Sequence, residues 1–255
     1  MMVLQYYNNG DLRNYLNIKS ESYALKILDL YGITNGLLVI HNARKVHKDL
    51  HSGNILFQIY PYISDLGMCQ PANKEKSAKN EGVYGVLPYM APEVLRGHQY
   101  TTAADIYSFG VIMNEYLSEE TPHNDISHDY ILAVKVCKGL RPKISDDTPK
   151  LLVDWIVKCW DANVDNRPTA KELYQILKKW TDELHKRFHK DGDLKNGKIL
   201  AQIEECEKIR KNKKNRPGKN KPGNIQTHPQ AIYTSRPLNY NNLPEPINST
   251  KLGNV

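Results

Sequence analysis

Three oxygen-bearing side chains, Asp49, Asn54 and Asp65, follow one another in the sequence in a way that suits magnesium and phosphate chemistry. An acid such as Asp49 can orient an attacking hydroxyl or accept its proton, and the amide and acid that follow offer hard oxygen ligands for Mg²⁺. Asp49 and Asn54 lie in one run, Val46 to Phe57, and Asp65 opens the tripeptide Asp-Leu-Gly. The chemistry requires that these groups lie on neighbouring loops.

The elements around these residues are expected to bring them together. Residues 55–59 and 60–64 are predicted to form two short strands, which would set Asn54 and Asp65 on opposite sides of one cleft. A helix is predicted over about residues 21–42, because Leu30, Ile33, Leu37 and Ile40 repeat at helical spacing. Two glycines inside it, Gly32 and Gly36, are expected to let another helix approach closely.

Further motifs follow in a fixed order along the chain. Ala91-Pro92-Glu93 closes a polar stretch, an Asp-x-x-Ser-Phe-Gly segment begins at Asp105, and Arg167-Pro168 follows a tryptophan-rich helix. With His47-Lys48-Asp49-Leu50 as the catalytic loop, the set resembles the large lobe of eukaryotic protein kinases, in the tyrosine-kinase-like branch. Lys48 stands where that family usually has Arg, and Leu66 where it usually has Phe. His47, Glu93, Asp105 and Arg167 are then expected to be structural.

The resemblance implies a mainly α fold: a kinase-like large lobe with a small β-hairpin at the cleft, followed by a disordered basic tail. Residues 1–184 are assigned to the kinase domain from the hinge onwards, and residues 185–255 to the tail. Asp49, Asn54 and Asp65 are the predicted catalytic residues, and Asn54 and Asp65 the predicted metal ligands. Leu4, Tyr6 and Leu56 are expected to border the adenine of the nucleotide.

The implied activity is transfer of the γ-phosphoryl group of ATP, with Mg²⁺, to a protein hydroxyl in signalling. No G-x-G-x-x-G and no V-A-I-K-like lysine occurs in the 255 residues, so the small lobe is expected to be absent and stand-alone activity is not expected. The alternative is a non-catalytic binding or scaffold module. The expected partners are ATP and a protein substrate or a partner kinase. The residues do not decide whether the acceptor would be serine or threonine on the one hand or tyrosine on the other.

The charge is unevenly placed along the chain. Residues 1–180 carry equal numbers of basic and acidic residues, so the excess behind the net charge of +7 lies in the tail. A neutral body makes nucleic-acid binding an unfavoured interpretation. Four isolated cysteines favour free thiols over a disulfide framework or zinc site. With neither a signal peptide nor an apparent membrane span, no membrane partner and a cytoplasmic location are expected.

Two parts of the tail have patterns of their own. Ile199, Ile203 and Cys206 have the spacing of a short amphipathic helix, and the basic run 208–221 indicates either nuclear import or a solvated tail. Residues 228–246, which contain Tyr233 and Tyr240, are either a docking peptide or part of the same solvated tail. In the activation segment, Ser77 and Tyr84 are either phosphorylatable or ordinary loop hydroxyls.

Overall fold

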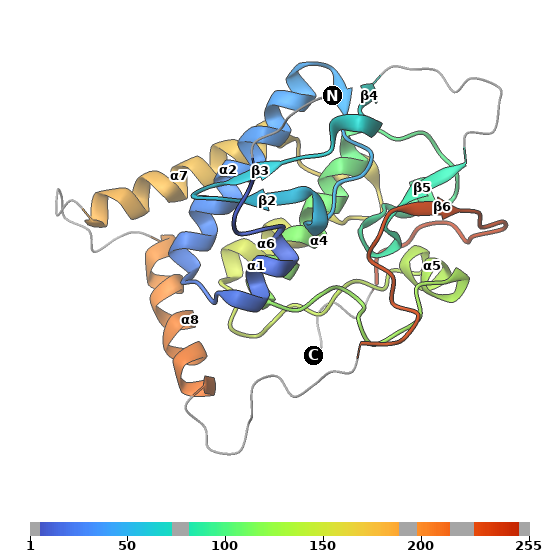
Figure 1. The fold of residues 1–255 in the computed structure, drawn as a ribbon. Helices are drawn as coiled ribbons and strands as arrows, with labels where there is room; N and C mark the ends of the chain where they lie inside the picture. Colours follow the sequence, from blue (N-terminus) through green and yellow to red (C-terminus); the bar gives the residue numbers. More distant parts are fainter. Residues whose placement is uncertain (1–5, 73–81, 189–197, 215–226, 250–255) are drawn as a thin grey trace.

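The computed structural model describes residues 6–72, 82–188, 198–214 and 227–249. Helices dominate these ranges, and Figure 1 shows short strands crossing the upper middle of the helical body and a further pair on its right. The helices are α1 (Leu12–Ile18), α2 (Tyr23–Asn42), α3 (Pro92–Leu95), α4 (Thr102–Ser118), α5 (Tyr130–Cys137), α6 (Lys150–Cys159), α7 (Ala170–Phe188) and α8 (Lys198–Lys214). The predicted mainly α fold is confirmed.

The strands form three separate antiparallel pairs. They are β1 (Lys45–Val46) with β4 (Gln70–Pro71), β2 (Ile55–Phe57) with β3 (Pro61–Ile63), and β5 (Val83–Gly85) with β6 (Arg236–Leu238). The predicted hairpin is the β2–β3 pair, in which Ile55 lies opposite Ile63 and Phe57 opposite Pro61. Its strands are shorter than expected, because residues 58–60 form the turn that reverses the chain.

Helix α4 occupies the centre of the core. Every residue from Ala104 to Leu117 is buried, and the helix packs against α2 and α6. The approach to α6 depends on Gly110, since a Cβ built there would lie only 2.6 Å from the Cβ of Cys159. Polar side chains on a helix that is buried on all sides need hydrogen-bond partners inside the protein. Helix α4 carries two buried acids, Asp105 and Glu115.

Helix α2 is the long helix that leads into the predicted catalytic loop. Its buried face, which includes Leu30, Ile33 and Leu37, matches the predicted stripe, and it packs against α7 and α4. The two glycines face a strand rather than a helix: Gly32 lies against Pro61 and Gly36 against Ile63. Close approach was therefore predicted correctly, but its partner is β3.

By length and composition alone, α2 could cross a membrane, which the sequence analysis did not anticipate. The same composition is expected of a helix in the core of a folded domain. Here the buried residues of α2 include Lys26, whose ammonium group lies 2.8 Å from Glu119 Oε1.

The expectation of a disordered tail over residues 185–255 is wrong for residues 198–214 and 227–249. Helix α7 continues through the predicted boundary to Phe188, and α8 buries Ile199 and Ile203 against the core. Glu207 accepts a hydrogen bond from the backbone N–H of Tyr23 at 2.7 Å, which ties α8 to the start of α2. Apolar spacing, rather than net charge, decided the structure of this segment.

Residues 227–249 return to the body of the lobe as an extended chain. Figure 1 shows this segment in red on the right, where β6 lies beside β5, on the side of the lobe away from α7 and α8. We call residues 227–249 the docked tail. Its proline- and asparagine-rich composition is typical of disorder, but composition does not show that a segment has a partner surface elsewhere in the chain.

Candidate active site

Asp105 holds the loop that contains Asp49. One of its carboxylate oxygens accepts the backbone N–H of His47 at 2.8 Å, and the other accepts that of Lys48 at 3.1 Å. Nε2 of His41 lies 3.0 Å from the first oxygen. Lys48 has a φ of +73°, a left-handed backbone that costs a non-glycine residue free energy. The bonds to Asp105 stabilise this conformation.

His47 joins the same loop to the end of the hairpin. Its buried ring donates from Nε2 to the carbonyl of Ser64 at 2.9 Å and accepts the N–H of Asp49 at Nδ1, at 3.3 Å. This arrangement requires the neutral ring with its proton on Nε2. His47 therefore connects the backbone of one predicted site residue to the residue that precedes another, Asp65.

Asn54 and Asp65 leave the hairpin at the same end. Asn54 accepts the N–H of Ser64 at 2.8 Å, which extends the β2–β3 ladder by one pair, and Asp65 is the next residue. The Asn54 side chain donates from Nδ2 to the carbonyl of Asp49 at 2.8 Å. The three predicted site residues thus lie on adjoining loops, joined by hydrogen bonds through Asn54 and Ser64.

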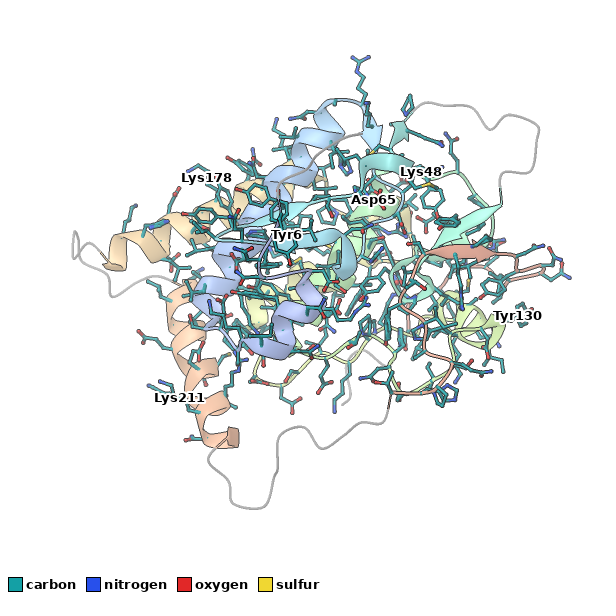
Figure 2. All side chains as sticks on the ribbon, in the orientation of Figure 1. Tyr6, Lys48, Asp65, Tyr130, Lys178 and Lys211 are labelled. Carbon is teal, nitrogen blue, oxygen red and sulfur yellow. The ribbon has the colours of Figure 1, made fainter. Side chains whose placement is uncertain are left out.

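Asp65 is exposed, whereas the other two predicted site residues, Asp49 and Asn54, are buried. Its φ is +55°, and one carboxylate oxygen accepts the N–H of Gly67 at 3.3 Å. Figure 2 labels Asp65 and Lys48 at the upper right of the lobe. Among the described residues, no three His, Cys, Asp or Glu side chains cluster as a metal site. An amide and one acid nevertheless fit Mg²⁺, which keeps several waters and takes further ligands from phosphate.

Asp49 itself is buried, with a side chain that is 5% exposed. Its Oδ2 accepts the hydroxyl of Ser235 at 2.6 Å and lies 3.8 Å from Nε2 of His51. Its Oδ1 is buried and has no hydrogen-bond partner among the described residues. Burial alone would raise the pKa of Asp49, but the nearby His51 ring and the hydrogen bond from Ser235 outweigh it and hold the pKa below its ordinary value. Asp49 is therefore an ionised carboxylate at neutral pH.

Two of the three predicted adenine-binding residues, Tyr6 and Leu56, are among the described residues. Tyr6, labelled in Figure 2, is 81% exposed. Leu56 is half-buried within β2, where it pairs with Asp11. Leu4 lies outside the described residues. The role of these residues in binding a nucleotide stays a prediction.

Glu93 and Arg167, both expected to be structural, form a buried ion pair. Two parallel hydrogen bonds join them, from Nη1 to Oε1 at 2.7 Å and from Nη2 to Oε2 at 2.8 Å. Arg167 also donates to the carbonyls of Asp161 and Ala103. The pair connects the end of the activation segment to the loop before α7. Its two charges are satisfied by a fork geometry that Lys could not reproduce.

Glu115 of α4 lies at the centre of a second buried polar cluster. Its oxygens accept the hydroxyl of Tyr89 at 2.7 Å and that of Ser52 at 3.1 Å, and Arg13 donates to Ser52 at 3.2 Å. Burial raises the pKa of Glu115 from 4.5 to about 7. Sequence reasoning did not single out this acid, because it sits in an unbroken helical pattern.

The raised pKa of Glu115 gives a pH-dependent prediction. Protonation favours the folded state, so its contribution is complete at pH below 4.5 and is lost as the pH rises towards about 7. At roughly 1.4 kcal/mol per pKa unit, the loss is about 3 kcal/mol. We expect Glu115→Gln to lack this loss. In urea unfolding, the free energy of unfolding of the variant should therefore rise relative to that of the wild type between pH 5 and pH 8. Parallel pH profiles of the two proteins would contradict this assignment.

The activation segment runs from Asp65 to Glu93, and its residues 73–81, which include Ser77, lie outside the described residues. Tyr84 lies in β5, and its hydroxyl donates to the carbonyl of Ser235 at 3.2 Å. Lys48, the residue that replaces the usual Arg, places its ammonium group 5.2 Å from the ring centre of Tyr100. Whether either hydroxyl is phosphorylated stays a prediction.

Sequence reasoning missed two residues of the site, His51 and Ser235. His51 contacts the Asp49 carboxylate, and its Nδ1 accepts the N–H of Gly53 at 3.1 Å. The signal for His51 was its place two residues after Asp49, where a side chain can turn back on the same loop. No local signal exists for Ser235, because it lies 186 residues from Asp49.

The helical body, the hairpin and the loop held by Asp105 together define a lobe of the protein-kinase type. The family described as protein tyrosine and serine/threonine kinase matches residues 1–177. The match covers more than half of the chain, and the chain belongs to the protein kinase family.

Several relatives carry names that agree with this family. The chain is 29% identical over 209 residues to an Arabidopsis thaliana protein kinase and PP2C-like domain-containing protein, covering 68% of this chain and 32% of that protein. It is 28% identical to the dual specificity protein kinase splA of Dictyostelium discoideum, covering 71% of this chain and 8% of that protein. The serine/threonine/tyrosine-protein kinase HT1 of Arabidopsis thaliana is also 28% identical, with 71% and 47% covered. The chain therefore spans less than half of the length of each.

Proposed function

We propose that this lobe carries the acceptor side of a phosphotransfer site, which moves the γ-phosphoryl group of MgATP to a protein hydroxyl. Asp49 orients the acceptor hydroxyl and takes its proton, while Asn54 and Asp65 would hold Mg²⁺, which would supply positive charge beside the phosphates. The oxygen of the acceptor forms a bond to the γ-phosphorus as the bond to the β-phosphate oxygen breaks, and ADP leaves. Positioning and electrostatics supply most of the rate in such reactions.

One contact carries this proposal: a serine hydroxyl lies 2.6 Å from the Asp49 carboxylate. The geometry is that of a hydroxyl presented to a general base, within the hydrogen-bond reach that proton transfer requires. The lowered pKa of Asp49 keeps the carboxylate ionised at neutral pH, so it can accept a hydrogen bond from the hydroxyl. Its second oxygen, Oδ1, has no partner in the described part of the chain and remains a further point of contact for a bound group.

The residues of the metal site support their proposed role through their chemistry. The amide of Asn54 uses Nδ2 on the carbonyl of Asp49, which leaves its oxygen for a cation. The Asp65 carboxylate is exposed to the solvent side, as a ligand for a hydrated ion should be. Bound Mg²⁺ would neutralise charge on the phosphates of the nucleotide.

We propose serine or threonine as the acceptor rather than tyrosine. The chain that presents Ser235 is paired to β5 from the next residue onwards, so its backbone lies close to Asp49. A side chain with a single carbon between backbone and hydroxyl spans this gap. A tyrosine hydroxyl on the same backbone would lie several ångströms beyond the carboxylate, and the strand would have to move away from β5.

The test is a phosphotransfer assay on the full product of the encoding gene, with radiolabelled ATP, Mg²⁺ and a serine-containing peptide. Asp49→Asn is expected to lower the rate at least about 100-fold, the usual range for removal of a general base. Asp65→Asn should abolish any Mg²⁺-dependent shift of the melting temperature by ATP. Lys178→Ala, which breaks an exposed ion pair with Asp182 at 2.9 Å, is the control and should match the wild type. Transfer that survives Asp49→Asn would refute the proposal.

The second candidate is a non-catalytic binding module. The observation that favours it is that the chain's own Ser235 already occupies the position in front of Asp49. In that case the full gene product would show neither transfer nor a melting shift with MgATP, while the lobe would still bind protein partners.

A further inference from the structure

We propose that the docked tail is a built-in ligand of the protein-substrate surface, with Ser235 in the acceptor position, so that it competes with external substrates. The inference rests on the proposed function, which identifies the surface in front of Asp49 as the acceptor site. It also names the substrate class: an extended peptide with an aromatic residue two positions before the serine and a leucine three positions after it.

Backbone pairing fixes the register of the docked tail. Strand β6 runs antiparallel to β5, with Arg236 opposite Gly85, Tyr84 opposite Pro237, and Val83 opposite Leu238. Adding an extended peptide to an exposed strand is a general mode of peptide recognition, in which the main chain gives affinity and the side chains give specificity. Because β5 belongs to the activation segment, this pairing places the tail directly beside that segment.

Ser235 immediately precedes β6 and points to the predicted base. Its hydroxyl lies 2.6 Å from Oδ2 of Asp49 and 3.3 Å from Nε2 of His51. Its carbonyl accepts the hydroxyl of Tyr84 at 3.2 Å. The residue is thus held on both its side chain and its backbone, as an acceptor must be if its hydroxyl is to stay aligned.

Tyr233 anchors the tail two residues before the serine. Its hydroxyl donates to the carbonyl of Pro122 at 2.9 Å. The Arg13 guanidinium lies 4.6 Å from the centre of the Tyr233 ring, and the His128 ring meets it edge-on at 4.8 Å. Burial raises the pKa of Tyr233, so the hydroxyl stays protonated and remains a donor. A cation over a ring face and a satisfied hydroxyl are features of a specific aromatic pocket.

His128 also contacts the backbone of the tail. Its Nε2 lies 3.0 Å from the carbonyl oxygen of His123, and its Nδ1 lies 2.9 Å from the carbonyl oxygen and 3.0 Å from the backbone nitrogen of Ile232. Burial lowers the pKa of His128, which favours the neutral ring. Arg236 donates in turn to the carbonyl of His128. The lobe therefore contacts the tail on both sides of Ser235.

Further anchors hold the tail beyond β6. Leu238 and Leu243 are 5% and 8% exposed and belong to the core cluster of the lobe. Arg96 pairs with Glu245, and Ile247 donates its N–H to the carbonyl of Cys137 at 2.9 Å. A segment with this many separate contacts behaves as a tethered ligand. A tether gives it an effective concentration of the order of millimolar, which an external peptide must exceed.

Peptide binding to the full chain tests the inference. The probe is a fluorescein-labelled synthetic peptide with the sequence of residues 228–247, followed by anisotropy up to millimolar protein. The variant Tyr233→Ala/Leu238→Ala removes two anchors of the tail without altering the lobe that receives it. We expect the probe to bind this variant at least about tenfold more tightly than the wild type, because its own tail competes less. Lys211→Ala, on the exposed face of α8, is the matched control and should behave as the wild type.

Two further measurements complete the test. In the peptide, Ser235→Ala should weaken binding several-fold, since it removes a hydrogen bond to an ionised group. In the full chain, the tail variant should exchange the amide hydrogens of β5 at least about tenfold faster than the wild type. Equal binding to variant and wild type, no binding to either, or unchanged exchange in β5 would each overturn the inference.

Failure of the inference and failure of the proposed function are distinguishable. If transfer does not depend on Asp49 but the probe still prefers the tail variant, the proposed function fails and the tail remains a ligand of this surface. If transfer depends on Asp49 but the tail variant gains neither probe binding nor faster transfer to a serine peptide, only the inference fails.

Discussion

Replacing Arg167 with alanine is expected to lower the free energy of unfolding by about 3–5 kcal/mol. The side chain of Arg167 is fully buried and forms two short hydrogen bonds to Glu93. Without the guanidinium, Glu93 would be a buried carboxylate with no positive partner, and the carbonyls of Ala103 and Asp161 would lose a donor. The loss should appear in urea unfolding followed by tryptophan fluorescence, as a lower midpoint with an unchanged slope.

Two controls separate the buried pair from a general effect of removing charge. Lys178→Ala removes one partner of an exposed pair on α7 and should leave the midpoint unchanged. The double variant Glu93→Ala/Arg167→Ala should lose less than the sum of the two single variants, because neither charge is then left alone in the core. A single-variant loss below about 1 kcal/mol would show that the pair contributes no more than a surface contact.

Asp105→Asn is expected to lower the free energy of unfolding by about 2–4 kcal/mol, because buried donors to a charged group lose their acceptor. The carboxylate accepts from His47 and Lys48 of the catalytic loop and contacts His41. An amide of the same shape has only one oxygen, so at least one of these donors would face an N–H group. Lys48, whose φ is +73°, would be the first residue to relax.

Asp65→Asn is the matched control for this prediction. Asp65 is the other acid near the loop, but it is exposed and accepts a single bond from Gly67. Its replacement should leave the unfolding free energy within about 0.5 kcal/mol of the wild type. Hydrogen exchange should localise the effect of Asp105→Asn to the loop around Asp49. If both variants are equally stable, Asp105 does not hold the loop.

The sequence predicted most of what lies close together along the chain. Asp49, Asn54 and Asp65 were placed on adjoining loops because their spacing, and the strands between them, left few alternatives. Local rules also worked for Thr169 and Glu172: their spacing predicts a capping box, and Glu172 donates its N–H to the Thr169 hydroxyl at 3.2 Å while accepting the Thr169 N–H at 2.8 Å. Such hydrogen bonds depend on a few neighbouring residues and can therefore be predicted from the sequence.

The sequence did not predict contacts between distant segments. The sequence predicts that another element packs closely against Gly36, which is confirmed. It does not show that this element is a strand, with Ile63 in contact, rather than a helix. The prediction of a disordered tail rests on composition, which gives no information about contacts with the rest of the chain. Tyr84 and Ser235, for example, are 151 residues apart, and their contact depends on how the whole lobe folds.

Helix α8 has a practical consequence for where the protein can be cut. Its residues Ile199 and Ile203 complete the core, Glu207 caps the start of α2, and Arg210 pairs with Glu119. The family resemblance alone would place the domain boundary at residue 184. A protein that ended there would expose apolar surface and would remove the contacts of α8 with α2. The contacts of α8 with the body extend as far as Arg210, so we expect α8 to melt together with the helices it packs against rather than fray ahead of them.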